Sequence, residues 1–329
     1  MKKLLLAGVA FAALAGSATA ADLARPVYRR PVVYAPIASW TGFYVGGNLG
    51  YGWGGARTDV AGSGTDSFPA TPTPAVGGIT TVRFADSNTA RLNGLIGGGQ
   101  AGYNVQLNPR WIAGLETDIQ ASGQRGSGAS IDPFSSPQCS VAVGPPPSVC
   151  TIFSNLVGAG VTSYEGRIDW FGTVRGRIGV LVTDHLLAYG TGGLAYGHVK
   201  VSDNTNLNGT ILNGSVFILP GTFAATMTQF SASETRAGWT VGGGVEGKFS
   251  GLLPSNWTWK LEYLYVDLGS VDTLSPFAAI FLNPNTLTPN PNLSPLTGAV
   301  TTHTHFRDNI VRVGLNYQFG SYAAPAVYK

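Results

Sequence analysis

The sequence predicts an all-β protein, an eight-stranded antiparallel transmembrane β-barrel with short periplasmic turns and long extracellular loops. Segments of alternating apolar and polar residues recur along the chain, and short connections alternate with long ones. The 329 residues include 46 Gly and 20 Pro, and only 11% are charged. Alternation over about 10 residues turns one row of side chains to lipid and the other to a polar lumen. A soluble sandwich gives no reason for every long connection to lie at one end.

The N-terminus predicts export. Lys2 and Lys3 precede an apolar run, and Ala18-Thr19-Ala20 forms a small-x-small cleavage site, so residues 1–20 are expected to be a signal peptide. The apolar run is shorter than the roughly 20 residues of a spanning helix. Residues 21–39 are expected to form a periplasmic segment, either a solvated tail or a contact with peptidoglycan or a periplasmic partner. The barrel is expected over 40–319 and a C-terminal tail over 320–329.

The strands follow in order. In the first strand, Phe43, Val45 and Leu49 share one parity, while Tyr44 and Asn48 share the other. In the fifth strand, glycines leave it undecided which residues face lipid. The fourth is expected to turn Ile168, Trp170, Val174 and Ile178 to lipid. The expected strands cover 41–53, 92–107, 111–119, 168–182, 186–201, 239–249, 257–265 and 311–319. Tryptophans near strand ends predict interface girdles, and these are Trp40, Trp53, Trp111, Trp170, Trp257 and Trp259.

The connections alternate in length as in outer-membrane barrels. Three are tight, at 108–110, 183–185 and 250–256. Four are long and rich in Pro, Ser, Thr and Asn, and these cover 55–90, 123–163, 202–234 and 269–304. The long ones are expected to be outer loops, and the sequence does not choose among host surfaces, haem and phage as their ligand.

The inward rows carry charges of both signs. Eight strands leave an interior just wide enough for side chains to fill, and buried charges must pair, so the sequence predicts a salt-bridged plug. The alternative is a narrow, anion-selective constriction, because Arg167, Arg175 and Arg177 crowd one strand. The expected lumen network is Arg167, Asp169, Arg175, Arg177, Glu116, Asp118, Glu246, Lys248, Lys260, Glu262 and Arg312.

Other candidate chemistry is sparse. Cys139 and Cys150 lie in one outer segment of an exported chain and are expected to form a disulfide rather than remain free thiols. His303 and His305 share a face and are a candidate haem or metal site, against the plainer interpretation of two solvated residues. We expect no cofactor and no enzyme, because no Ser, His and carboxylate converge. Without residues 1–20 the formal net charge falls from +3 to +1, which predicts no nucleic-acid partner.

Three stretches carry a family resemblance: WTGFYVGGNLGYGWGG in the first strand, DWFGTVRGRIGV in the fourth and VRVGLNYQF in the last, after an ADL start at Ala21. They resemble alphaproteobacterial outer-membrane proteins related to opacity and haemin-binding surface proteins, the porin-family small barrels. The resemblance implies an outer-membrane barrel with a structural, immunogenic, porin-like or haemin-binding role.

The last strand also resembles the signal that the outer-membrane assembly machinery reads. Its residues are Arg312, Gly314, Tyr317 and Phe319, and this chain continues for ten residues beyond the phenylalanine. The expected partners are outer-membrane lipid and lipopolysaccharide, that machinery, and a host or haem ligand at the loops. The expected state is a monomer in the Gram-negative outer membrane.

Overall fold

A computed structural model describes residues 39–68, 78–143, 149–212, 222–226, 230–249, 254, 256–282 and 296–319. The predicted signal peptide, the segment 21–38 and the tail 320–329 lie outside these residues. Within the described part, no helix has the length and apolar character needed to cross a membrane.

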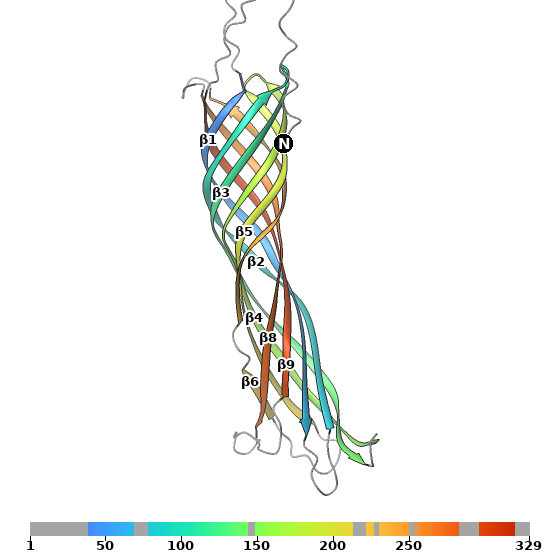
Figure 1. Cartoon of the computed structure of the whole chain (residues 1–329). Coiled ribbons are helices and arrows are strands. Elements are labelled where there is room, and N and C mark those ends of the chain that lie inside the picture. Colours follow the sequence, from blue (N-terminus) through green and yellow to red (C-terminus); the bar gives the residue numbers. More distant parts are fainter. Residues whose placement is uncertain are drawn as a thin grey trace, which may run out of the picture. The chain divides into compact units, whose positions relative to one another are not determined.

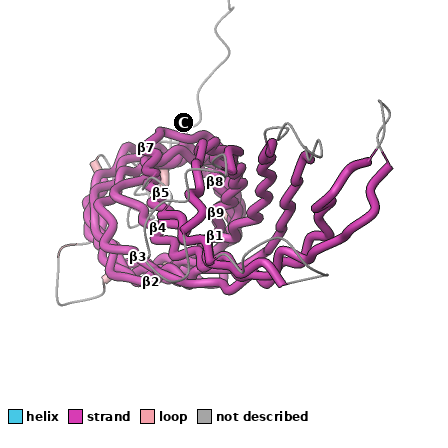
Figure 2. The backbone as a smooth tube through the Cα atoms, turned by 90° about the horizontal axis from the view of Figure 1, so that it is seen from below, coloured by secondary structure: helices cyan, strands magenta, loops and turns pink. Residues whose placement is uncertain are grey.

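The described chain is all β (Figure 1). The strands are β1 (Gly42–Phe68), β2 (Gly78–Gln106), β3 (Trp111–Val143), β4 (Val149–Thr183), β5 (Leu186–Leu212), β6 (Thr222–Thr226), β7 (Phe230–Lys248), β8 (Trp257–Leu282) and β9 (Leu296–Gln318). Antiparallel pairing joins β1-β2-β3-β4-β5-β7-β8-β9, and β9 pairs with β1, so eight strands close a ring (Figure 2). The short β6 lies between β5 and β8. The predicted fold class is confirmed.

The strands are much longer than the sequence predicted. The first predicted outer loop, 55–90, is largely a paired hairpin: Gly55 pairs with Arg91, and the register continues without a break to Phe68 and Gly78. Alternation persists there, with Val60 and Phe84 buried between exposed or half-exposed neighbours. Paired strands satisfy the backbone hydrogen bonds of these segments, which a long irregular loop would leave to water.

The ring opens into two sheets along two seams. The register between β2 and β3 ends at Asn93 and Arg125, and that between β7 and β8 ends at Trp239 and Asp267. The other neighbouring strands of the ring stay paired beyond this level. Beyond the seams, β2-β1-β9-β8 form one four-stranded face and β3-β4-β5-β7 the other, and the short β6 joins the two by pairing with both β5 and β8. We call the strands beyond these seams the extension; it comprises 54–68, 78–92, 126–143, 149–168, 199–212, 230–238, 268–282 and 296–307.

An apolar core fills the outer part of the ring and lies between the two sheets. Gly166 of β4 shows their contact, because a Cβ there would lie 3.3 Å from Ala56 on β1 and 3.7 Å from Phe306 on β9. Packing two inner faces is the arrangement of a β-sandwich. The core consists of Ala56, Ala90, Leu92, Ile96, Tyr164, Ile168, Phe171, Ala195, Val199, Val201, Leu264, Val266, Leu268, Val271, Phe306 and Ile310.

The outside of the ring is apolar, as a lipid-facing band requires. Its exposed side chains include Leu49, Leu95, Leu115, Ile178, Leu194 and Val313. Trp53, Trp111 and Trp259 are also exposed there. Trp40 is an exception to the predicted girdle: it is only 1% exposed, and its indole donates to the Asp184 carbonyl at 3.3 Å.

Candidate functional site

Inside the ring, charged side chains from five strands meet at one level. They occupy alternate positions of each strand, so the pleat turns them all inward. β3 contributes Glu116 and Asp118, β4 contributes Arg175 and Arg177, and β7 contributes Glu246. β8 contributes Lys260 and Glu262, and β9 contributes Arg312; all eight are buried. We call this set the lumen network.

Arg175 lies at the centre of the lumen network. Its Nη2 donates to Asp118 Oδ2 at 2.9 Å and also bonds Glu116, and its Nη1 donates to Glu262 Oε1 at 3.1 Å. The Nε donates to Thr173 Oγ1 at 2.9 Å. The guanidinium thus contacts three carboxylates from two sides of the ring, which ties β4 to β3 and β8.

Arg312 and Lys260 share the same carboxylates. Arg312 Nε donates to Glu262 at 2.7 Å, and its Nη2 donates to Asp118 at 2.9 Å. Lys260 Nζ donates to Glu116 at 2.7 Å. Glu116 therefore accepts from groups on β4, β8 and β9, and these bonds cross the lumen.

Arg177 lies in a second arm with two tyrosines. Its Nη2 donates to Glu246 at 2.7 Å, its Nη1 donates to Tyr44 Oη at 3.0 Å, and its guanidinium lies 4.0 Å from the Tyr189 ring centroid. Tyr44 in turn donates to Glu116 at 2.6 Å. Sequence reasoning missed both tyrosines, although the inward parity of Tyr44 in the first strand was a usable signal.

A neutral polar layer borders the lumen network. Asn48 donates to Gln100 at 3.0 Å, Gln100 donates to Asn316 at 2.5 Å, and Asn316 donates to Glu246 at 3.1 Å. The chain of amides joins β1, β2, β9 and β7. It fills the bore with hydrogen-bonded side chains next to the ion pairs.

The charges within the lumen network balance. Arg175, Arg177, Lys260 and Arg312 supply four cations, while Glu116, Asp118, Glu246 and Glu262 supply four carboxylates. A buried charge without a partner is costly, and here each cation bonds at least one carboxylate. The arrangement is suited to filling and bracing the ring.

Two residues predicted for the lumen lie outside it. Arg167 and Asp169 bond each other on the outer wall, where their side chains are 38% and 22% exposed, and Lys200 also contacts Asp169 at 2.9 Å. The cause is a β-bulge, because the β4–β5 register skips Asp169 between Ile168 and Trp170. One extra residue reverses the facing of everything beyond it. Ile168, predicted to face lipid, is therefore buried in the apolar core.

Lys248 is buried as predicted but lies apart from the lumen network. Its Nζ donates to the Ser39 carbonyl at 3.0 Å and lies 4.9 Å from the Trp40 ring centroid. These contacts are at the short-turn end of the ring, because Trp40 also bonds Asp184 of the β4–β5 turn. Lys248 and Trp40 thus cover the periplasmic mouth.

His303 and His305 share the outer face of β9, where each contacts a carboxylate of β8. His303 bonds Asp272, and His305 Nε2 lies 3.0 Å from Asp267. Within the described residues, no group of three or more potential ligands is placed to hold a metal ion. Cys139 and Cys150 lie on paired β3 and β4, but their side chains are outside the described residues, so the disulfide stays a prediction.

The predicted assembly signal lies in β9 and just after it. Arg312 points into the lumen network, while the rings of Tyr317 and Phe319 meet edge to face at 4.9 Å. Phe319 is 48% exposed. A role in recognition by the assembly machinery remains a prediction.

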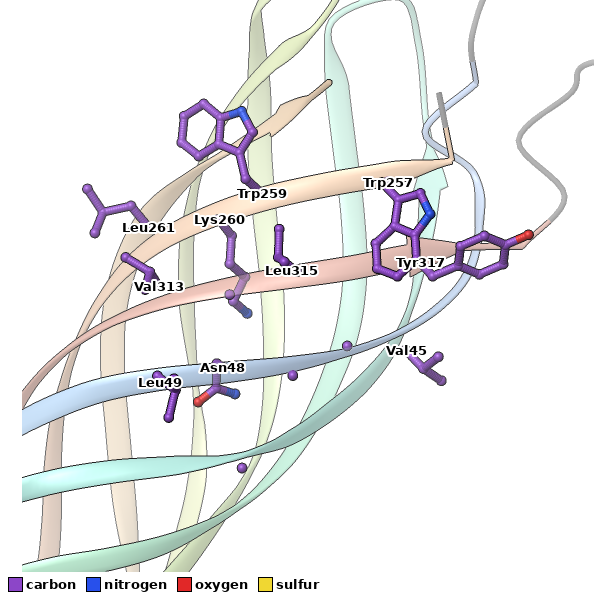
Figure 3. Close-up of a pocket in the computed structure, with 14 residues that line it drawn as sticks. Val45, Asn48, Leu49, Trp257, Trp259, Lys260, Leu261, Val313, Leu315 and Tyr317 are labelled. Atoms are coloured by element: carbon purple, nitrogen blue, oxygen red, sulfur yellow. The ribbon is translucent and has the colours of Figure 1, made fainter. Parts of the chain in front are cut away.

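A groove of about 1020 Å³ lies where β1, β8 and β9 meet near the short-turn end (Figure 3). Val45, Leu49, Trp257, Trp259 and Leu315 are among the residues that line it. Among its glycines, Gly47 shares the outward parity of Val45 and Leu49 and adds no side chain to the outer wall, while Gly46, Gly98 and Gly314 lie at inward positions. Most of its lining belongs to the apolar outer band, and Asn48 and Lys260 of the lumen also contribute to it.

Comparison with known proteins agrees with this architecture. The model of the outer membrane protein beta-barrel domain matches residues 7–319. The chain belongs to this family. A 31 kDa outer-membrane immunogenic protein of Brucella melitensis is 34% identical over 328 residues, covering 97% of this chain and 100% of the relative. A 22 kDa outer membrane protein of Rhizobium leguminosarum is 28% identical, covering 72% of this chain and 68% of the relative.

These relatives place the protein in the bacterial outer membrane and confirm the alphaproteobacterial resemblance. They are named as outer-membrane proteins rather than enzymes. Among solved structures, the attachment invasion locus protein Ail of Yersinia pestis covers 81% of this chain and 98% of its own at 12% identity, with a TM-score of 0.23. That likeness is too weak to support a functional comparison.

Proposed function

We propose that this outer-membrane barrel is closed to solutes and that it holds its extension at the cell surface for contact with external ligands. The proposal rests on the side chains that fill the interior of the ring. The balanced lumen network fills the ring, and the apolar core follows directly outside it. A conducting path through both layers would require separating buried ion pairs and wetting a packed hydrocarbon core.

The alternative of an anion-selective constriction has less support. It depended on three arginines crowding one strand of the lumen, but Arg167 lies on the outer wall. Arg175 and Arg177 both bond carboxylates. Cations that are already paired offer a passing anion no free binding site. The two arginines instead hold strands of the ring together.

The surface role rests on the length of the extension. Strands such as β3 and β4 continue far past the seams, and long outer segments are the extracellular parts of such barrels. The Brucella relative is named immunogenic, which fits a surface-exposed protein. We assign no haem site, because His303 and His305 each contact a carboxylate of β8.

Planar-bilayer recording of the refolded mature chain tests closure. We expect a silent membrane under conditions in which an open porin, reconstituted in parallel, gives discrete conductance steps. Circular dichroism and protease resistance verify that the inserted protein is folded. Reproducible single-channel steps from folded wild-type protein would refute the closed barrel.

A further inference from the structure

The outer wall carries three cations side by side on neighbouring strands. In the register of the sheet, Arg125 of β3 lies directly opposite Arg167 of β4, and Arg167 lies directly opposite Lys200 of β5. Their inner neighbours Gln124, Ile168, Val199 and Val201 are buried, so the three side chains point outward. We call Arg125, Arg167 and Lys200 the basic row.

This arrangement is unfavourable for the protein alone. Residues directly opposite on antiparallel strands have Cβ atoms about 5 Å apart, and like charges there repel each other. Asp169 offsets part of the charge by bonding Arg167 and Lys200. Arg125 forms no ion pair with any residue that the structure describes.

Charges near the basic row leave an excess of positive charge. Arg91 lies on β2 two residues beyond Asn93, the partner of Arg125, and also points outward. Glu165 faces outward on β4, opposite Ser127 and Ser202. Four cations against Asp169 and Glu165 leave two positive charges in excess, with serine hydroxyls beside them.

The position of the basic row relative to lipid follows from its aromatic neighbours. Trp170 on β4 stacks on His198 of β5, with ring centroids 6.3 Å apart, and contacts Tyr196 edge to face at 6.1 Å. Such rings mark the boundary between the hydrocarbon and the headgroups. Arg167 lies three residues beyond Trp170 and Lys200 four beyond Tyr196, roughly 10 Å along a strand. The basic row therefore lies at headgroup level.

We propose that the basic row binds the phosphate groups of an anionic lipid in the outer leaflet. A phosphate between Arg125 and Arg167 accepts bidentate, charge-assisted hydrogen bonds and removes the repulsion between the two guanidinium groups. The apolar wall below the aromatic rings lies where the acyl chains of the same molecule pack. The site recognises the lipid by the charge of its headgroup. It is separate from the closed bore.

Lipid binding to the full mature protein in neutral detergent micelles tests the proposal. The probes are diphosphorylated lipid A and the same lipid with its phosphates removed, titrated and counted by native mass spectrometry. The wild-type protein is expected to retain the phosphorylated lipid at least about tenfold more tightly, the size of one charge-assisted hydrogen bond. Equal retention of both lipids would overturn the proposal.

Variants locate the site. R125Q/R167Q is expected to lose the preference for phosphorylated lipid, while R125K/R167K keeps part of it, because the charges remain but lysine cannot form bidentate bonds to a phosphate. R83Q is the matched control, since it removes an exposed arginine of β2 eight residues beyond Arg91; it is expected to bind like wild type. Loss in R83Q equal to that in R125Q/R167Q would overturn the assignment.

The source of the phosphate is tested by competition. Inorganic phosphate at the concentration of the lipid is expected to leave the lipid bound, because the acyl chains add affinity through the adjoining wall. Full displacement by inorganic phosphate at that concentration would overturn a lipid as the ligand.

Discussion

In both the ring and the extension, side chains alternate between the inner and outer faces of the strands. The two regions differ in which face carries the polar residues and which the apolar ones. In the ring, charged residues such as Arg175 and Glu262 are buried while Leu95 and Leu115 are exposed. In the extension, Phe306 and Val271 are buried while charges such as Arg57 lie on the surface. Lipid surrounds the first region and water the second. The surrounding solvent therefore decides which face of a strand holds the apolar residues.

Two bulges lie where the chemistry changes. Besides the skip at Asp169 in β4, the β8–β9 register skips Leu268 between Asp267 and Gly269. Gly269 has a φ of 74°, a left-handed conformation that glycine adopts without a steric penalty. Leu268 keeps the inward facing of Leu264 and Val266, and beyond the bulge the inward face passes to Val271. Strands β1 and β9 have no such bulge. Their inward positions keep the same parity, and the residues there change from polar to apolar between the ring and the extension.

The largest expected effect is in the ring. Replacing Arg175 by Met removes a partner from Glu116, Asp118 and Glu262, and leaves buried negative charge uncompensated. We expect the free energy of unfolding to fall by about 3–5 kcal/mol. Urea unfolding of the protein in lipid vesicles, followed by tryptophan fluorescence, measures it.

Arg57→Met is the matched control, because it breaks an arginine–aspartate pair whose side chains are 63% and 48% exposed. An exposed pair contributes little to stability, because water and salt screen the two charges. Equal losses in the two variants would mean that burial does not distinguish the lumen network from a surface pair.

A smaller effect is expected in the apolar core of the extension. Phe306 is 0% exposed, and Phe306→Ala leaves a cavity between the two sheets that costs about 3 kcal/mol. The loss is expected to appear as faster proteolysis of the extension while the ring stays protected in lipid. Leu274→Ala, at a side chain 61% exposed, is the control. Simultaneous loss of protection in both regions would contradict separate packing of ring and extension.

The smallest expected effect depends on pH. Burial and the neighbouring Asp86 carboxyl raise the pKa of Asp132 in the extension to about 6, above the roughly 3.9 of an unfolded chain. The folded form then holds a proton that the unfolded form has lost, so stability falls as pH rises from about 4 to about 6.

Asp132→Asn is expected to remove this part of the pH dependence. Proteolysis rates of the extension between pH 4 and 7 measure it, with Asp59→Asn at an exposed site as the control. An unchanged pH profile in Asp132→Asn would assign the dependence to another group.

The odd or even position of a residue along its strand explains which parts of the site could be predicted from the sequence. Arg175, Arg177 and Arg312 were placed correctly because regular alternation fixes their face relative to exposed neighbours such as Val174 and Val313. Arg167 was misplaced because a bulge has no clear sequence signature, and a single skipped residue inverts the inference. Tyr44 and Tyr189, which contact Arg177, were overlooked because an aromatic residue is compatible with either face, although the inward parity of Tyr44 was a usable signal.

The sequence by itself determined the fold class, the ring of strands and the side of the wall on which most charges lie, since these depend on a local period of two. Only the tertiary structure decided which cations meet which carboxylates, where the ring divides into two sheets, and that the predicted loops are strands around an apolar core. Those outcomes depend on register and on bulges, which are set by contacts between strands distant in the chain.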